Sequence, residues 1–281
     1  SDQTFTLVFW DGETHEIGEG ESKFKIIIHN FPGKKELFAD PSTALGEAYM
    51  TGDIELVGNL QEIVESIMRR NKSFLNESKL LGMLGKCSPA GKRKSERDIA
   101  HHYDIGNDFY ALWLDPTMSY SCAYFKTGSD NLYDAQMNKI HHILKKLNLR
   151  EGQTLLDIGC GWGFLAIEAA KKYRVRVLGI TLSKEQLKKA QERIKDEGLQ
   201  VLVAVKLMDY RDLEKTGLKF DRVVSVGMAE HVGKANLPLY LKNVNAVLHE
   251  TGLFLLHNIT NMLETEVNGF IAKYIFPGGY I

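Results

Sequence analysis

The sequence predicts an α/β protein with a mostly parallel, Rossmann-like sheet and a small α+β domain before it. From residue 154 onward, short apolar runs alternate with helical patterns, the order that produces parallel strands joined by helices. Residues 4–29 instead show short alternating runs separated by turns, which is typical of a small separate sheet. Three glycines, Gly159, Gly161 and Gly163, follow the first apolar run of the larger region. Ligands of parallel sheets bind beside such turns.

The composition is that of an ordinary globular protein. The chain has 281 residues and a net charge of −1, which gives no argument for a nucleic-acid partner. Its three cysteines, Cys87, Cys122 and Cys160, lack paired spacing, which argues against a disulfide framework and favours a reducing compartment. No apolar run reaches the roughly 20 residues that span a bilayer, and no signal-peptide pattern opens the chain. We therefore expect a cytoplasmic protein.

Residues 1–84 are predicted to form the small α+β domain. Alternating apolar residues within 4–29 indicate antiparallel strands with one buried face. Helices are expected over 42–52, ending at Gly52, and over 60–68, with a strand at 54–57 between them. None of these residues forms a catalytic pattern, so we expect this domain to serve binding, docking or assembly.

A basic flexible linker is predicted over residues 85–98. The segment is polar, contains glycine and proline and shows no periodicity. Its Lys92, Arg93, Lys94 and Arg97 could contact anionic headgroups, at about 1 kcal/mol for each basic residue near a charged surface. A solvated linker without a partner explains the same composition equally well.

The stretch 99–125 is rich in aromatic side chains and lies just before the glycine turn, which indicates the wall or lid of a pocket. A helix is predicted over 131–147, with Ser129 or Asp130 as its N-cap. Adjacent His141 and His142 on this helix are expected at its surface, and we expect no metal site.

The larger domain, residues 99–281, is predicted to contain five parallel strands, at 154–158, 175–180, 201–207, 221–227 and 253–258. Ser183 and Gln186 form a capping-box signature for a helix that ends before Gly198. The helix before the fifth strand has Pro238 near its start and Gly252 past its end. Because ligands lie at the carboxyl ends of parallel strands, one site is expected from residues 157–163, 181–186, 209–210, 230–231 and 257–259.

The glycine turn favours S-adenosylmethionine as the ligand. Leu155 to Gly163 is predicted to be a strand, a turn and the start of a helix, which brings a nucleotide-like ligand close to backbone amides. The spacing differs from the Gly-x-Gly-x-x-Gly of dinucleotide folds, and Asp157 directly precedes the turn. A pyrophosphate would gain nothing from a carboxylate beside it. A purely structural turn is the alternative interpretation.

The chain resembles the cyclopropane fatty acid synthases and their mycolic acid cyclopropane synthase relatives. The similarity runs from about His102 to Gly279, and residues 46–53 (GEAYMTGD) resemble the N-terminal module of the bacterial phospholipid branch. Seven motifs carry it in the family's order: HYDIGNDFY (102–110), YSCAYF (120–125), LLDIGCGWG (155–163), GITLSKEQ (179–186), SVGMAEHVG (225–233), HNIT (257–260) and YIFPGG (274–279).

The resemblance implies a class I S-adenosylmethionine-dependent methyltransferase that acts on a cis double bond in a phospholipid acyl chain. Methyl transfer would leave a carbocation, and bound bicarbonate would remove a proton to close a cyclopropane ring. Aromatic faces stabilise a cation by about 0.5–2 kcal/mol each, and residues 103–125 can supply them. The implied unsaturated phospholipid partner places the protein at the inner face of the cell membrane, with residues 1–84 as a lipid-binding or docking domain. A homodimer is compatible with the sequence.

The resemblance also implies the site residues. Bicarbonate would be held by the backbone amides of Cys122 and Ile259, the carboxylate of Glu230 and the ring of His257. The family's last holder, a tyrosine, lies beyond Ile281. The residues expected to bind the cofactor lie on four segments: Tyr120, Ser121, Asp157, Gly159, Cys160, Gly161, Trp162, Gly163, Thr181, Leu182, Gln186, Asp209 and Tyr210.

Several alternatives stay open at this point. The acceptor could be an amine or a sphingolipid, because a fold and a cofactor turn do not define a substrate. A non-catalytic lipid- or cofactor-binding protein is a third interpretation. Cys122 with His257 and Glu230 could form a nucleophilic triad, although nothing in the sequence activates the thiol. Class I sheets have seven strands and five are predicted here, so we expect the chain to be C-terminally incomplete.

Overall fold

The structure is a computed structural model that describes residues 4–68, 106–260 and 268–275. These residues form two compact units, and each is described by itself. The first unit consists of the described residues up to 68 together with Asn268–Lys273, and the second contains the remainder. The predicted linker at 85–98 lies outside the described residues, so the predicted boundaries at 84 and 99 stay a prediction.

The first unit contains a four-stranded sheet in the order β2-β1-β3-β4. Its strands are β1 (Phe5–Val8), β2 (Thr14–Ile17), β3 (Lys25–Ile28) and β4 (Ile54–Val57). The prediction of antiparallel strands in this region is wrong for one pair, because β1 and β3 run parallel. β2 ends beside the start of β1, and residues 18–24 lead the chain around that same end to the other edge of β1. β3 must therefore start where β1 starts.

Three helices follow the chain through this unit: α1 (Lys34–Ala39), α2 (Pro41–Thr51) and α3 (Leu60–Met68). α2 has the predicted position because its ends are marked locally. The side chain of Asp40 accepts a hydrogen bond from the Thr43 amide at 3.1 Å, and Gly52 ends the helix in the left-handed conformation at φ +81°. The core between the sheet and α2 contains Ile28, Ala48 and Ile54.

A fourth helix, α10 (Gly269–Tyr274), belongs to this unit although it follows the last strand of the second one in sequence. The ring of Phe270 packs where Gly46 of α2 has no side chain, and Lys273 forms an ion pair with Glu47. A side chain at Gly46 would overlap that ring. The glycine in α2 therefore leaves the space in which α10 packs.

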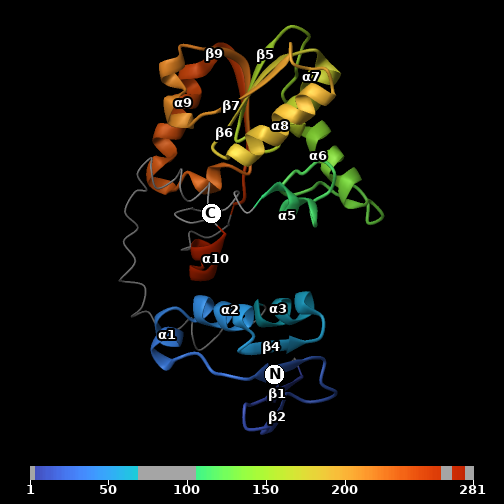
Figure 1. Ribbon diagram of the computed structural model, residues 1–281, viewed down its shortest axis with the longest axis vertical. Coiled ribbons are helices and arrows are strands. Elements are labelled where there is room, and N and C mark those ends of the chain that lie inside the picture. Colours follow the sequence, from blue (N-terminus) through green and yellow to red (C-terminus); the bar gives the residue numbers. More distant parts are fainter. Residues whose placement is uncertain (1–3, 69–105, 261–267, 276–281) are drawn as a thin grey trace. The chain divides into compact units, whose positions relative to one another are not determined.

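The second unit contains a five-stranded, fully parallel sheet in the order β7-β6-β5-β8-β9 (Figure 1). Its strands are β5 (Thr154–Ile158), β6 (Arg176–Thr181), β7 (Val203–Leu207), β8 (Phe220–Val226) and β9 (Leu248–His257). The predicted α/β class and all five predicted strands are confirmed. β9 begins five residues earlier than predicted, so Gly252 lies within this strand and α9 ends at Val247 without a glycine.

Helices cover both faces of this sheet, which makes it a Rossmann-like doubly wound fold. α6 (Leu132–Lys146), α7 (Phe164–Tyr173) and α8 (Lys184–Asp196) pack on one face, with Leu144, Ala166 and Ala190 in the shared core. α9 (Leu237–Val247) packs on the other, with Tyr240 and Val244 against the sheet. Figure 1 shows α9 on the opposite side of the strands from α7 and α8. Both faces of the central strands β5, β6 and β8 are thus mostly buried.

Local signals place most of these helices as predicted. Ser183 caps α8 by accepting a hydrogen bond from the Gln186 amide at 3.2 Å. The predicted cap of α6 is wrong, because Asn131 accepts the bond from the Asp134 amide at 2.9 Å. Asp130 is occupied one turn earlier, where it accepts bonds from the Lys126 and Thr127 amides. Of the described residues, none lies in a helix that is both long and apolar enough to cross a membrane.

Candidate active site

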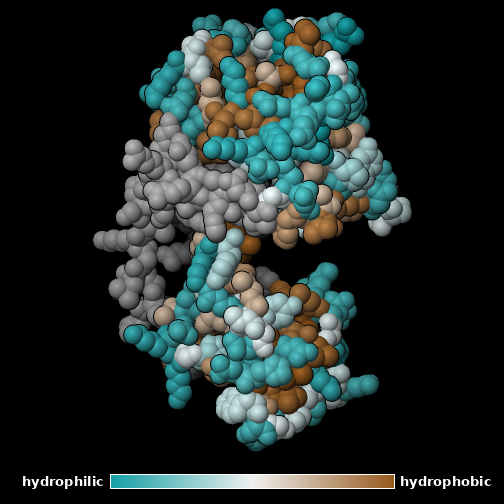
Figure 2. Space-filling view, in the orientation of Figure 1, coloured by the Kyte–Doolittle hydropathy of each residue, from teal (hydrophilic) through white to brown (hydrophobic). Residues whose placement is uncertain are grey.

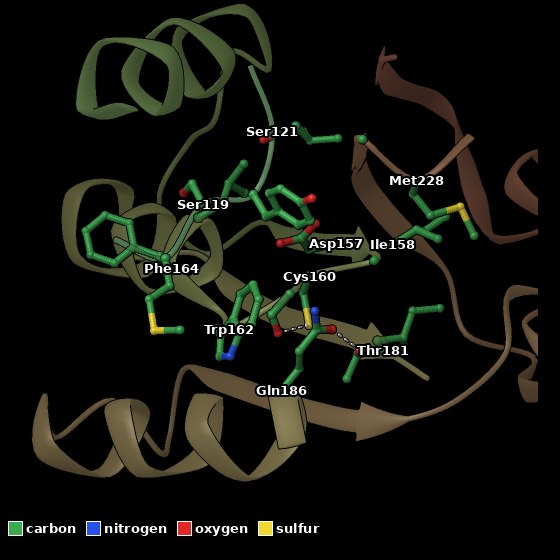
Figure 3. Close-up of a pocket in the computed structure, with 18 of the residues that line it drawn as sticks. Ser119, Ser121, Asp157, Ile158, Cys160, Trp162, Phe164, Thr181, Gln186 and Met228 are labelled. Carbon is green, nitrogen blue, oxygen red and sulfur yellow. Dashed lines mark hydrogen bonds between the residues drawn. The ribbon is translucent and has the colours of Figure 1, made fainter. Parts of the chain in front are cut away.

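A pocket opens at the carboxyl ends of β5, β6 and β8 (Figure 3). Its walls come from residues 117–121 before α6, the inner face of α6, the turns after β5 and β6, the starts of α7 and α8, and the loops after β7 and β8. Eleven of the thirteen predicted cofactor residues line it, namely Tyr120, Ser121, Asp157, Gly159, Cys160, Gly161, Trp162, Thr181, Leu182, Gln186 and Tyr210. The segments meet here because parallel strands all end at one edge of the sheet.

The glycine turn forms the floor of this pocket. Gly159 and Gly163 have φ of +78° and +79°, a left-handed conformation that favours glycine. A Cβ at Gly161 would meet open space, so this glycine leaves room for a ligand. Gly163 does not line the pocket, and a Cβ there would lie 3.0 Å from the Cβ of Ala190. Gly163 therefore serves the close approach of α7 and α8.

Asp157 is a buried carboxylate that lines the pocket. Its side chain is buried at the end of β5, and within the described residues its Oδ2 atom has no hydrogen-bond partner. Burial raises the pKa of the Asp157 carboxyl to about 7. A buried, unpaired carboxylate that borders a pocket favours a ligand carrying a positive charge or a hydrogen-bond donor, and S-adenosylmethionine offers both.

The turn after β6 is held by hydrogen bonds between its own residues. The Thr181 hydroxyl donates to Gln186 Oε1 at 2.7 Å and accepts from the Ser183 amide at 3.2 Å. Figure 3 shows Thr181 and Gln186 joined by this bond beside the glycine turn. The Gln186 side chain therefore points to Thr181 and does not return to the cap, as a complete capping box would require. Thr181 and Gln186 are thereby fixed at the pocket edge.

Aromatic rings form one wall of the site. Tyr120 and Trp162 line the pocket, and the Tyr110 ring packs against both, with centroid distances of 5.7 and 5.2 Å. Trp113 lies 5.0 Å from Tyr120 in an edge-to-face arrangement. The Trp162 indole donates to Asn107 Oδ1 at 2.7 Å, which orients the ring. The predicted aromatic wall is confirmed for the described part of residues 99–125.

Asp209 and Tyr210 are neighbours in sequence but differ in their relation to the pocket. Tyr210 lines the pocket, whereas Asp209 does not. The Asp209 carboxylate is buried and accepts a hydrogen bond from the Arg211 amide at 2.8 Å. Its second oxygen lies 3.6 Å from the Arg211 guanidinium. Asp209 is thus held within its own loop, and its contact with the cofactor stays a prediction.

The four residues predicted to hold bicarbonate lie on neighbouring segments beside the pocket. The buried Glu230 carboxylate accepts a hydrogen bond from the Ile259 amide at 2.7 Å. The Gly227 amide donates to the His257 carbonyl at 2.9 Å, and a Cβ at Gly227 would lie 3.3 Å from the Ser121 Cβ. Cys122 is exposed and follows Ser121 directly. Glu230 and Ile259 are therefore in contact, and Gly227 links the His257 and Cys122 segments.

The sequence-based reasoning missed Lys139, which lines the pocket from α6. Its ammonium donates to the Ser121 hydroxyl at 2.7 Å, and the neighbouring Gln136 amide donates to the Ser119 and Ser121 carbonyls at 3.0 and 3.1 Å. Both side chains are buried. The signal was available, because Gln136 and Lys139 lie at helical spacing among the apolar residues Ala135 and Ile140. Two polar residues on an apolar stripe indicate a buried polar function.

Comparisons with known proteins agree with this geometry. Residues 90–281, more than half of the chain, match the model of the mycolic acid cyclopropane synthetase family. The chain belongs to this family. Residues 1–79 match a second model, described as a domain of unknown function. The chain is 40% identical to a probable fatty acid methyltransferase of Pseudomonas putida, over 97% of this chain and 70% of that protein. It is 41% identical to the cyclopropane-fatty-acyl-phospholipid synthase of Escherichia coli K12, over 92% and 67%.

Solved structures of family members show the same architecture. Mycolic acid cyclopropane synthase CmaA1, complexed with SAH and CTAB, is 37% identical with a TM-score of 0.61 and covers 66% of this chain and 69% of that one. The cyclopropane synthase MmaA2 of Mycobacterium tuberculosis gives the same values. Coclaurine N-methyltransferase, at 23% identity, shares the fold. This family member is therefore an S-adenosylmethionine-dependent methyltransferase with a Rossmann-like fold.

Proposed function

We propose that this protein methylates a cis double bond in a phospholipid acyl chain and closes a cyclopropane ring there. The observation that carries the proposal is a junction of two sites: a pocket suited to a cationic methyl donor adjoins the Glu230–Ile259–His257 group at one edge of the sheet. Relatives named as a cyclopropane-fatty-acyl-phospholipid synthase and a probable fatty acid methyltransferase, each about 40% identical, support a lipid acyl chain as the acceptor.

The chemistry requires two steps at this junction. The alkene π electrons attack the sulfonium methyl, the carbon–sulfur bond breaks, and S-adenosylhomocysteine is left as a neutral thioether. The second alkene carbon becomes a carbocation. A base then removes a proton from the new methyl group, and the released electron pair forms the third carbon–carbon bond of the ring. The enzyme must therefore supply cation stabilisation and a proton acceptor in one water-poor space.

The aromatic wall meets the first requirement. Tyr120 and Trp162 border the pocket, the buried Tyr110 ring packs against both of them, and Trp113 packs edge-to-face on Tyr120. A ring face stabilises a cation within about 6 Å by roughly 0.5–2 kcal/mol, more where water is absent. None of these side chains carries a carboxylate or amine that would trap the carbocation. The wall thus favours a cationic intermediate without reacting with it.

The group around Glu230 meets the second requirement if it holds bicarbonate, which supplies a proton acceptor when bound. Within the described residues, Glu230 Oε2 and His257 Nδ1 are both buried without a hydrogen-bond partner. The Glu230 oxygen needs a donor, which the bicarbonate hydroxyl provides, and a His257 N–H would bind an anionic oxygen. The amides of Cys122 and Ile259 would complete the site. Because the Ile259 amide already bonds to Glu230, it would be shared between both acceptors.

Membrane attachment forms part of the same proposal, because the acceptor double bond lies within a bilayer. Exposed apolar side chains follow one another at i, i+4 spacing on two helices of the first unit: Leu45 and Tyr49 on α2, and Leu60 and Val64 on α3. Figure 2 shows apolar residues gathered on the surface of this unit. We infer that these rows contact the lipid surface. Liposome flotation of Leu60→Glu, with Glu55→Gln as control, tests the attachment.

The decisive experiment is a transfer assay with labelled S-adenosylmethionine and vesicles of unsaturated phospholipid. We expect label in cyclopropane acyl chains and none with saturated vesicles. Label in headgroups or in an added amine would contradict the acyl-chain acceptor and favour the second methyltransferase interpretation. Binding of S-adenosylhomocysteine without any transfer would contradict catalysis altogether.

A further inference from the structure

Lys139 is a buried cation without a carboxylate partner. Its side chain is 5% exposed, on the face of α6 that packs into the unit. Lysine is almost never fully buried unless it is paired. Among the described residues, no carboxylate lies within ion-pair distance of Lys139, and the Ser121 hydroxyl, at 2.7 Å, is the acceptor of its hydrogen bond. An ammonium has three N–H donors. The site therefore has unused donor capacity.

The charge of the Asp115 carboxylate acts on Lys139, but the two side chains form no ion pair. The Asp115 carboxylate accepts bonds from the Thr117 amide and hydroxyl, at 3.0 and 2.8 Å, which occupy both of its oxygens. Burial lowers the pKa of the Lys139 ammonium to about 8, against opposing effects of Asp115 and Cys122. The group is thus still mostly charged at pH 7, and the free protein keeps that charge at an energetic cost.

Lys139 and Asp157 border the same pocket with opposite charges. Of the described residues that line it, Lys139 is the only lysine or arginine, and Asp157 is the only carboxylate. The donor that this enzyme class uses ends in a zwitterion, with an α-ammonium and an α-carboxylate on one carbon. A pocket with one buried anion and one buried cation is complementary to such a group. The Asp157 carboxylate suits the α-ammonium of the donor. The α-carboxylate of the donor then needs a cation, and Lys139 is the cation in this pocket.

We propose that Lys139, together with Ser121, binds the α-carboxylate of the methyl donor. Since the Lys139 ammonium donates to Ser121 Oγ, the Ser121 hydroxyl proton is free to donate in turn. Such a chain of charge-assisted bonds strengthens each member. Gln136 supports the arrangement by holding the Ser119 and Ser121 carbonyls. The inference rests on the donor part of the proposed function and not on the lipid acceptor.

The test compares two ligands that differ in the amino-acid group. S-adenosylhomocysteine carries the α-carboxylate, whereas 5′-methylthioadenosine has the same nucleoside without it. Isothermal titration calorimetry measures both affinities. We expect Lys139→Met to lower the affinity for S-adenosylhomocysteine by about 10- to 100-fold, the range for a charge-assisted hydrogen bond. The affinity for 5′-methylthioadenosine should stay within about twofold of the wild-type value. Lys145→Met, an exposed substitution on the same helix, is the matched control and should change neither.

Other outcomes would overturn the inference. An equal loss of affinity for both ligands in Lys139→Met would mean that Lys139 only shapes the Ser121 segment. An unchanged affinity for S-adenosylhomocysteine would mean that Lys139 has no role in binding the donor. A wild-type chain that binds neither ligand would refute the donor assignment, whereas donor binding without lipid transfer would refute only the acceptor. If Lys139→Met does not fold, wild-type affinity for decarboxylated S-adenosylhomocysteine gives the same answer. An affinity equal to that for S-adenosylhomocysteine would contradict carboxylate recognition.

Discussion

The Glu230 carboxylate accepts a hydrogen bond from the backbone amide of Ile259 at 2.7 Å, which joins the loop after β8 to the end of β9. One oxygen of this buried carboxylate is used to hold the loop, and the other has no partner within the described residues. Under the proposed function, the first oxygen has a structural role and the second would have a chemical one. Substitutions can therefore be chosen that keep the first function and remove the second.

Glu230→Gln is such a substitution, because the glutamine carbonyl can still accept from Ile259. We expect a loss of ring formation of at least about 100-fold, the contribution typical of a positioned proton-transfer group, with S-adenosylhomocysteine affinity nearly unchanged. His257→Ala should behave similarly. Glu250→Gln, an exposed carboxylate on β9, is the control for both. A large loss of cofactor binding in the Glu230 variant would show that Glu230 belongs to the donor site.

Removal of bicarbonate should slow the wild-type enzyme. In CO2-free buffer we expect the rate of cyclopropane formation to fall by at least about tenfold, since the proton acceptor leaves, and to recover when bicarbonate is added. Residual activity of Glu230→Gln should respond weakly to the same addition, because that variant lacks the carboxylate that binds the hydroxyl. A rate that is independent of bicarbonate in the wild type would exclude it as the acceptor.

Asp157→Asn should stabilise the free protein at high pH. Burial raises the pKa of Asp157 from 3.8 to about 7, so the folded state binds a proton more tightly than the unfolded state. The cost of the buried charge is therefore absent below about pH 4, grows as the pH rises, and is complete above about pH 7. The variant should gain about 1–4 kcal/mol over wild type at pH 8, and less at pH 5, by urea denaturation.

The control for this prediction has the opposite sign. Hydrogen bonds from the Thr154 amide and hydroxyl lower the pKa of Asp221. Asp221→Asn should therefore destabilise the protein at pH 8, where the charged carboxylate is the favourable form. Asp157→Asn should at the same time weaken S-adenosylhomocysteine binding. A stability difference for Asp157→Asn that does not change between pH 5 and pH 8 would contradict its burial in the charged form.

Gly163→Ala should cost more stability than Gly152→Ala. Both glycines have left-handed backbone, at φ of +79° and +82°, so both variants carry the same conformational strain. A Cβ at Gly163 also lies 3.0 Å from the Cβ of Ala190, whereas at Gly152 it meets open space. We expect about 1–3 kcal/mol of additional loss from this overpacking between α7 and α8. Equal losses by chemical denaturation would show that these helices move apart without cost.

Gly46→Val should displace α10 from α2 within the first unit. The Phe270 ring occupies the space above Gly46, and a valine side chain cannot share it. Hydrogen exchange of the α10 amides should accelerate by at least about tenfold, because a local unfolding equilibrium shifts when packing is lost. Met50→Val, at an exposed position of the same helix, should leave the exchange unchanged. Unchanged exchange in Gly46→Val would mean that Phe270 contributes little to this contact.

The features that were predicted correctly depend on neighbours in sequence. Short runs of neighbouring residues determine the five strands of the second unit, the Ser183 cap and the glycine turn. The predicted cofactor residues meet at one pocket because parallel strands end at one edge, a rule of topology. Eleven of thirteen line it, and the two others, Gly163 and Asp209, serve packing and an internal ion pair.

The features that were missed depend on which partner each residue finds in the folded chain. Lys139 donates a hydrogen bond to Ser121, which lies eighteen positions earlier, and the two segments meet only in the folded chain. The parallel pairing of β1 and β3 follows from the route of residues 18–24, which no alternation pattern encodes. The choice of Asn131 over Asp130 as a cap depends on which of two adequate side chains is already bonded elsewhere. Local propensity cannot decide such competitions.

Gly227 lies between the Ser121 segment of the pocket and the end of β9. This residue has left-handed backbone at φ +63°, its amide donates to the His257 carbonyl, and a Cβ in its place would lie 3.3 Å from the Ser121 Cβ. A side chain there would meet Ser121, a residue that lines the pocket. Under the proposed function, a single peptide unit would then connect the methyl-donor pocket to the group that holds the proton acceptor.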